Sequence, residues 1–167
     1  NGEKAISFFK KVRYNSSLNI LLYNKISKAF SIIGKPDSAD KYLSLALAEN
    51  KKWNGDKKNV RHGLTLQYRG EQYLAENKFK EAINDFQKAI VQFYPDYNEL
   101  DIYKNPENFS GVFSYINLFN ALTGKADAFE KLYLQDKKQE PLDAALNAYR
   151  SAFKLADYVE KTYDSDE

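Results

Sequence analysis

The chain has 167 residues, enough for one compact domain or a short array of repeats, and its 43% hydrophobic and 29% charged residues are ordinary for a folded protein. Its 25 basic and 23 acidic residues are interleaved and leave a net charge of +2, so the concentrated basic face of a nucleic-acid-binding protein is not evident. Without cysteine, and with His62 as its one histidine, the chain has no disulfide, no thiol nucleophile and no conventional zinc site.

The first predicted helix lies near residues 3–13, where Ala5, Phe9 and Val12 share one face at the spacing i, i+4, i+7. A similar set of small and large apolar residues returns 34 residues further along the chain. This period is typical of a helix–turn–helix repeat. We therefore expect the chain to begin inside a repeat, of which only the second helix is present.

The next predicted pair comprises helices near residues 17–33 and 36–51. Their inner faces carry the same spacing, at Tyr23, Ser27 and Phe30 in the first helix and at Ala39, Leu43 and Ala46 in the second. Gly34 breaks the first helix, and Pro36 suits the first turn of the second, where its missing N–H is not needed. The run Asn54-Gly55-Asp56 then predicts a turn.

A further pair is predicted near residues 59–76 and 79–93, with a break at Asn77. Its inner faces are marked by Leu66, Gly70 and Tyr73 in the first helix and by Ala82, Phe86 and Ala89 in the second. Gly70 and Ala82 are expected where the two helix backbones approach closely, because a longer side chain there would push the helices apart. Phe86 is expected to fill the space between this pair and a neighbour.

Residues 94–111 interrupt the helical pattern. Pro95 and Pro106 oppose a continuous helix in this stretch, and we expect a linker over residues 97–111.

The last predicted pair lies near residues 112–135 and 140–163. It repeats the spacing at Leu122, Ala126 and Phe129, and again at Ala145, Tyr149 and Ala152. Seven more residues separate these two sets than separate the sets of the preceding pair. We therefore expect an enlarged turn over residues 133–140, after which Pro141 restarts a helix.

Together these elements predict an all-α fold of about seven helices, stacked as antiparallel pairs. A generic helical bundle is the alternative, since small and large residues alternate in any packed pair of helices. The recurrence of one spacing in four places, two of them 34 residues apart, favours stacked repeats.

These residues resemble tetratricopeptide repeats over most of the chain. Residues 20–53 and 63–96 resemble two full repeats, residues 5–13 the end of an earlier one, and residues 112–163 a third repeat with an enlarged turn. The resemblance implies a right-handed α-solenoid that serves as a protein–protein interaction scaffold.

A narrower resemblance rests on three short runs: Pro95-Asp96-Tyr97, the stretch DIYKNP at residues 101–106, and LTGKADAF at residues 122–129. They are similar to the repeat region that precedes the caspase-like peptidase domain of bacterial CHAT proteins. The resemblance implies a fragment of a larger bacterial multidomain protein. The catalytic residues would then lie in another segment, because a chain without cysteine lacks the nucleophile.

Members of the repeat family bind peptides on a concave surface lined by the first helix of each repeat. By this analogy the lining positions are Leu21, Asn24, Lys28, Ser31, Leu64, Gln67, Glu71, Leu74, Asn120, Thr123, Asp127 and Glu130. The candidate partner-binding residues among them are Asn24, Lys28, Gln67, Glu71, Asn120 and Asp127.

Some repeats of this family clamp the terminal carboxylate of a peptide with Lys and Asn. Here Asn24 and Lys28 occupy those two positions in swapped order, and Glu71 adds a negative charge beside them. The lining therefore favours a peptide with a basic group near Glu71 and Asp127. The alternative is that this surface packs against an adjacent domain of the parent chain.

No phosphate loop, metalloprotease motif, hydrolase motif or calcium loop is present, so we expect neither an enzyme nor a cofactor or metal. A structural or oligomerisation module is the alternative to a peptide scaffold, with residues 5–13 packing on a second copy.

No apolar run approaches the roughly 18 residues that a membrane span requires. No signal peptide is visible, which favours the cytoplasm. The compartment nevertheless stays unassigned, because the chain begins at Asn1 and contains no Met, as expected of a piece of a longer protein.

Overall fold

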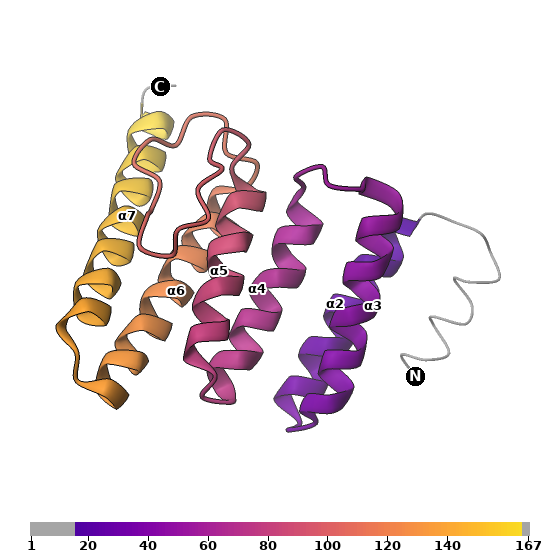
Figure 1. Cartoon of the computed structure of the whole chain (residues 1–167). Coiled ribbons are helices and arrows are strands. Elements are labelled where there is room, and N and C mark those ends of the chain that lie inside the picture. Colours follow the sequence, from indigo (N-terminus) through magenta and orange to yellow (C-terminus); the bar gives the residue numbers. More distant parts are fainter. Residues whose placement is uncertain (1–15, 165–167) are drawn as a thin grey trace.

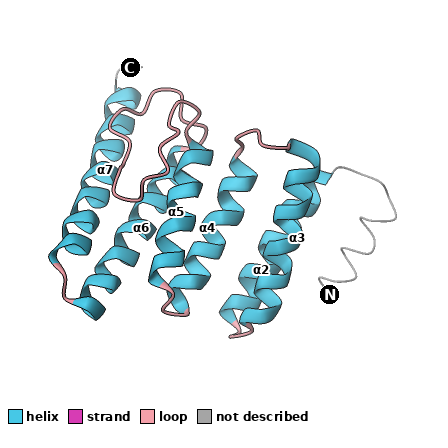
Figure 2. Ribbon diagram, in the orientation of Figure 1, coloured by secondary structure: helices cyan, strands magenta, loops and turns pink. Residues whose placement is uncertain are grey.

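The computed structural model describes residues 16–164, and this part of the chain consists of six α-helices and connecting loops, without strands (Figure 2). The helices are α2 (Ser16–Ile32), α3 (Pro36–Asn54), α4 (Val60–Ala75), α5 (Phe79–Phe93), α6 (Tyr115–Asp136) and α7 (Gln139–Asp164). The all-α fold class is thus confirmed. The helix predicted near residues 3–13 lies outside the described residues.

The helices pack as three antiparallel pairs, α2 with α3, α4 with α5 and α6 with α7, which follow one another in chain order (Figure 1). Extensive contact between α5 and α6 joins the second pair to the third. The first pair meets the second through smaller contacts, which α4 makes with α3 and α2.

Local chemistry explains where these helices begin and end. Gly34 adopts a positive φ of 69° after α2, a conformation that is easy only for glycine, and Pro36 opens α3 as expected. The side chain of Asn59 caps α4 by accepting a hydrogen bond from the backbone N–H of His62 at 2.9 Å. His62 is accordingly a helix-start residue.

The turn between α6 and α7 corrects one expectation. The seven additional residues were expected to enlarge this turn, but α6 runs to Asp136 and α7 begins at Gln139. The additional residues instead lengthen the helices, to 22 residues in α6 and 26 in α7, against 16 and 15 in α4 and α5. Leu, Gln, Lys and Glu dominate this stretch, and all four favour helix.

The small residues predicted on the inner faces of α4 and α5, at Gly70, Ala82 and Ala89, are buried. Ala82 and Ala89 are fully buried, and Phe86 packs so closely on α4 that a Cβ added to Gly70 would lie 3.2 Å from its ring. The same ring also meets α6, where a Cβ at Gly124 would lie 2.6 Å from it. Phe86 therefore fills the space between the second and third pairs.

The connection from α5 to α6 is a packed loop over residues 94–114, anchored by two lysines. Lys58 Nζ donates to the backbone carbonyls of Tyr94, Pro95 and Tyr97 at 3.0, 2.7 and 2.7 Å. Lys125, fully buried on α6, donates to the carbonyl of Lys104 at 2.9 Å. The loop expected as a linker thus belongs to the folded body.

Candidate functional site

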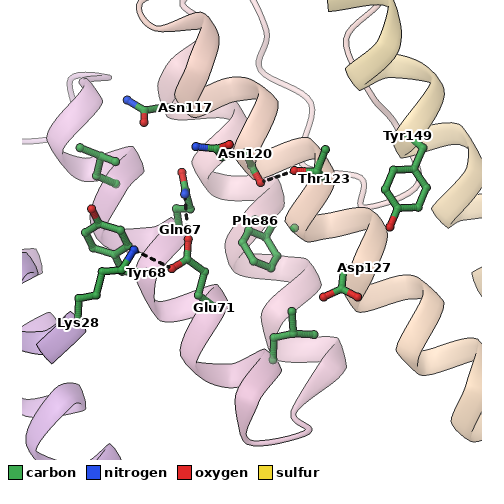
Figure 3. A pocket seen from close by; sticks show the side chains of 13 residues that line it. Lys28, Gln67, Tyr68, Glu71, Phe86, Asn117, Asn120, Thr123, Asp127 and Tyr149 are labelled. Atoms are coloured by element: carbon green, nitrogen blue, oxygen red, sulfur yellow. Dashed lines mark hydrogen bonds and ion pairs between the residues drawn. The ribbon is translucent and has the colours of Figure 1, made fainter. Parts of the chain in front are cut away.

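A groove of about 560 Å³ lies between α4 and α6, with single contributions from α2, α5 and α7 (Figure 3). We call it the α4–α6 groove. One wall is formed on α4 by Leu64, Gln67, Tyr68, Glu71 and Leu74. The opposite wall is formed on α6 by Asn117, Asn120, Thr123, Gly124 and Asp127. Lys28, Phe86 and Tyr149 complete the lining.

Helical periodicity explains why these residues share a surface. The residues of each wall recur at steps of three or four positions, which brings them to one face of their helix. The opposite faces of α4 and α6 are occupied by core contacts, among them Leu66 and Leu122. The polar walls therefore face each other across Phe86, which is 1% exposed and lies at the floor.

Carboxylates stand on both walls. Glu71 accepts a hydrogen bond from Gln67 Nε2 at 3.0 Å and lies 3.9 Å from Lys28 Nζ. Asp127 lies 3.7 Å from Lys131 Nζ on its own helix. Both ion pairs are longer than a hydrogen bond and involve half-exposed side chains, so neither carboxylate is tightly neutralised.

Gln67 is the unusual member of the lining. Its side chain is only 4% exposed, and its Oε1 atom is buried without a hydrogen-bond partner among the described residues. An unpaired polar atom of this kind costs free energy, about 1–3 kcal/mol, which a suitable donor would recover. A third acceptor oxygen is thus available in the α4 wall beside Glu71.

Two aromatic hydroxyl-bearing side chains flank the groove. Lys28 Nζ lies 5.0 Å from the ring centroid of Tyr68, which holds this lysine at the rim. On the other side, burial raises the pKa of Tyr149, and the charges of Glu130 and Asp127 raise it further. Its hydroxyl therefore stays protonated and donates to Glu130 Oε2 at 3.4 Å.

The structure brings together five of the six candidate residues named from the sequence: Lys28, Gln67, Glu71, Asn120 and Asp127 line the groove. Asn24 does not line it. Its side chain is 1% exposed, and its Oδ1 accepts a hydrogen bond from Thr65 Oγ1 at 2.9 Å, which ties α2 to α4. Asn24 is therefore a packing contact between helices.

Sequence reasoning missed five lining residues, Tyr68, Phe86, Asn117, Gly124 and Tyr149, of which Phe86 and Tyr149 had been assigned to helix packing. Asn117 stands three positions before Asn120, and Gly124 three before Asp127, so helical spacing carried a signal for both. Tyr68 stands four positions after Leu64 and three before Glu71, so the same spacing pointed to it as well.

Residues 16–164 contain neither a metal-binding cluster nor a membrane-spanning helix. No group of three or more His, Asp or Glu side chains in this part of the chain is placed to hold a metal ion. None of its helices combines the length and the apolar character needed to cross a membrane.

Comparison with known proteins gives no further assignment. The sequence matches no protein-family model and no curated protein, and the structure matches no solved structure.

Proposed function

We propose that the chain is a protein-interaction module of the tetratricopeptide type, a right-handed α-solenoid whose α4–α6 groove binds a peptide segment of a partner protein. One observation carries the proposal. Residues that the resemblance assigns to the concave surface of separate helix pairs, from α2, α4 and α6, line a single groove. A generic bundle has no reason to bring those positions together.

The size and chemistry of the groove support a peptide as ligand. A volume of about 560 Å³ fits a few side chains, and binding pockets commonly span about 300–1,000 Å³. The lining mixes amide and carboxylate groups with apolar side chains such as Leu64 and Leu74. Such a surface can pair with a peptide backbone and hold individual side chains.

The alternative of an oligomerisation module depended on residues 5–13, which lie outside the described residues.

The test is a selection of random dodecapeptides displayed on phage against the immobilised chain, followed by NMR mapping of a selected peptide. We expect the largest shift changes at Gln67, Glu71, Asn120 and Asp127. Asn120→Trp, which fills the groove from an exposed position, should abolish binding. Asn84→Trp on the exposed surface of α5 is the matched control and should bind normally.

Two results would contradict the proposal. One is a selection that enriches no peptide. The other is a peptide whose shift changes lie away from the groove and whose affinity is unaffected by Asn120→Trp.

A further inference from the structure

We propose that the α4–α6 groove recognises an arginine side chain of its bound peptide, held by Gln67 Oε1 and by the carboxylates of Glu71 and Asp127. This inference rests on the proposed function and adds the chemical class of the residue recognised. Three features of the groove support it: a buried acceptor without a hydrogen-bond partner, two weakly paired carboxylates, and tyrosine rings in the same lining.

The orientation of the Gln67 amide is fixed by its neighbour. A carboxylate such as that of Glu71 only accepts hydrogen bonds, so the amide end facing it at 3.0 Å must be Nε2. Flipping the amide would set two oxygens against each other. Oε1 therefore faces away from Glu71, in the wall of the groove, and has no hydrogen-bond donor among the described residues (Figure 3).

The negative charges near this acceptor favour a cationic ligand. Glu71 on α4 and Asp127 on α6 face the same space from opposite walls (Figure 3). Their present partners, Lys28 and Lys131, are held at 3.9 and 3.7 Å with side chains almost half exposed, and such pairs contribute about 0–1 kcal/mol. A cation that enters the groove and loses its water can compete with both lysines.

Arginine fits this arrangement better than lysine does. Its guanidinium carries five donors in a rigid plane, is more weakly hydrated than an ammonium, and stacks on aromatic rings. The acceptors here come from two walls, and the rings of Tyr68 and Tyr149 line the same groove. An acidic side chain would instead meet two carboxylates and an amide oxygen, against the single ammonium of Lys28 in the lining.

The experiment uses five sublibraries of N-acetylated, C-amidated nonapeptides. The central residue is fixed as Arg, Lys, citrulline, Glu or Ala, and the other positions are randomised equally. Binding to the chain is measured by fluorescence anisotropy, and its location by NMR of the labelled protein, including the Gln67 side-chain amide. Citrulline keeps the shape of arginine and removes its charge.

We expect the Arg sublibrary to bind about tenfold more tightly than the citrulline and Glu sublibraries and roughly threefold more tightly than the Lys sublibrary, with shift changes at the Gln67 amide. Groove binding in which Lys, Ala, citrulline or Glu equals Arg would overturn the arginine assignment and leave the proposed function standing. The absence of groove binding by every sublibrary would overturn both.

Charge-removing variants locate the interaction. Glu71→Gln and Asp127→Asn should each weaken binding of the Arg sublibrary by roughly tenfold, the typical effect of a hydrogen bond to a charged group. Asp157→Asn removes an equivalent charge from the exposed side of α7 and should leave binding unchanged. Equal effects of all three substitutions would mean that arginine senses only net charge, which would overturn the assignment. Circular dichroism melting of each variant shows that it is folded.

Discussion

A single residue, Lys28, distinguishes a groove that binds cationic side chains from one that binds carboxylates. Its ammonium stands 3.9 Å from Glu71 and competes with any cation that approaches this carboxylate. We expect Lys28→Gln to raise the affinity of the Arg sublibrary by about two- to fivefold, in line with the loss of an exposed ion pair. A groove that clamps a carboxylate would instead lose affinity, because lysine would then be the attracting group.

Fluorescence anisotropy titrations of the same peptides measure this effect. Lys25→Gln removes a charge from an exposed position of α2 that does not line the groove, and it should leave the affinity unchanged. Weaker binding of the arginine peptides to Lys28→Gln would contradict the assignment.

Lys125 is the most deeply buried charge that the described residues contain. Its Nζ donates to Gln87 Oε1 on α5 at 2.5 Å and, in the loop, to Asn105 Oδ1 and the Lys104 carbonyl, both at 2.9 Å. Burial lowers the pKa of Lys125 from 10.5 to about 7, partly opposed by the negative charge of Asp101. The folded protein therefore releases a proton from this side chain at a pH where the unfolded chain still holds it.

The free energy of unfolding should consequently rise with pH between about 7 and 10, because the unfolded chain binds more protons there. Below this window both states hold the proton, so the contribution of Lys125 no longer changes with pH. Between pH 7 and pH 9 we expect a gain of about 2 kcal/mol from this residue. Urea unfolding at both pH values measures it. In Lys125→Met this rise should vanish, although the variant is less stable throughout; an unchanged rise in the variant would show that other groups cause it.

Among the helices, the close approach of α4 and α6 to Phe86 sets how tightly the second and third pairs pack. An added Cβ at Gly124 would lie 2.6 Å from the Phe86 ring, so the helices must shift, whereas at Gly70 the distance is 3.2 Å and a small adjustment suffices. We expect Gly124→Ala to lower the free energy of unfolding by about 1–3 kcal/mol through overpacking.

Gly70→Ala should be close to neutral, because the higher helix propensity of alanine, about 1 kcal/mol, offsets its mild crowding. Thermal and urea unfolding compare the two variants. If they lose equal stability, the packing around Phe86 does not distinguish the two helices.

The close packing of α4 and α5 was predictable, because small residues at i, i+4, i+7 spacing form a local sequence pattern. Gly70, Ala82 and Ala89 are buried, as that pattern required. The walls of the groove were predicted from the resemblance to the repeat family, which assigns one face of the first helix in each pair to the concave surface. That assignment could not tell that Asn24 turns toward Thr65, because it defines a face and not the neighbour that covers it.

The loop over residues 94–114 was expected to be non-helical, but its packing against the helices escaped prediction for a related reason. Its anchors, Lys58 and Lys125, bind backbone carbonyls and side-chain oxygens that stand 20 to 39 positions away in the sequence. A lysine that donates to distant carbonyls has no local sequence signature. The two prolines of the loop predict only that no helix continues there. The short turn between α6 and α7 was mispredicted because motif spacing counts residues without showing whether they are helical.

At the scale of the whole molecule, the stability of the stack is unequal along its length. Two clusters of buried apolar residues join α4, α5, α6 and α7, whereas α2 and α3 share a separate cluster around Ile20 and Tyr42. The junction between the first and second pairs relies substantially on polar contacts, such as Asn24 with Thr65 and Asp40 with Gln72 at 2.9 Å. Regions with fewer shared apolar contacts open at lower free energy. The first pair should therefore be the first part of the described chain to open.

Hydrogen exchange measured by mass spectrometry tests this order, with faster exchange expected in α2 and α3 than in α5 and α6. Thr65→Val sharpens the test, because it keeps the shape of the side chain and leaves Asn24 Oδ1 buried without its donor, at a cost of about 1–3 kcal/mol. Faster exchange should then appear in α2 and α3 while α5 and α6 stay unchanged. Thr123→Val is the control, because the Thr123 hydroxyl donates to carbonyls of its own helix, and this variant should not alter exchange in α2 or α3. Uniform acceleration along the whole chain in Thr65→Val would mean that the three pairs unfold as one cooperative unit.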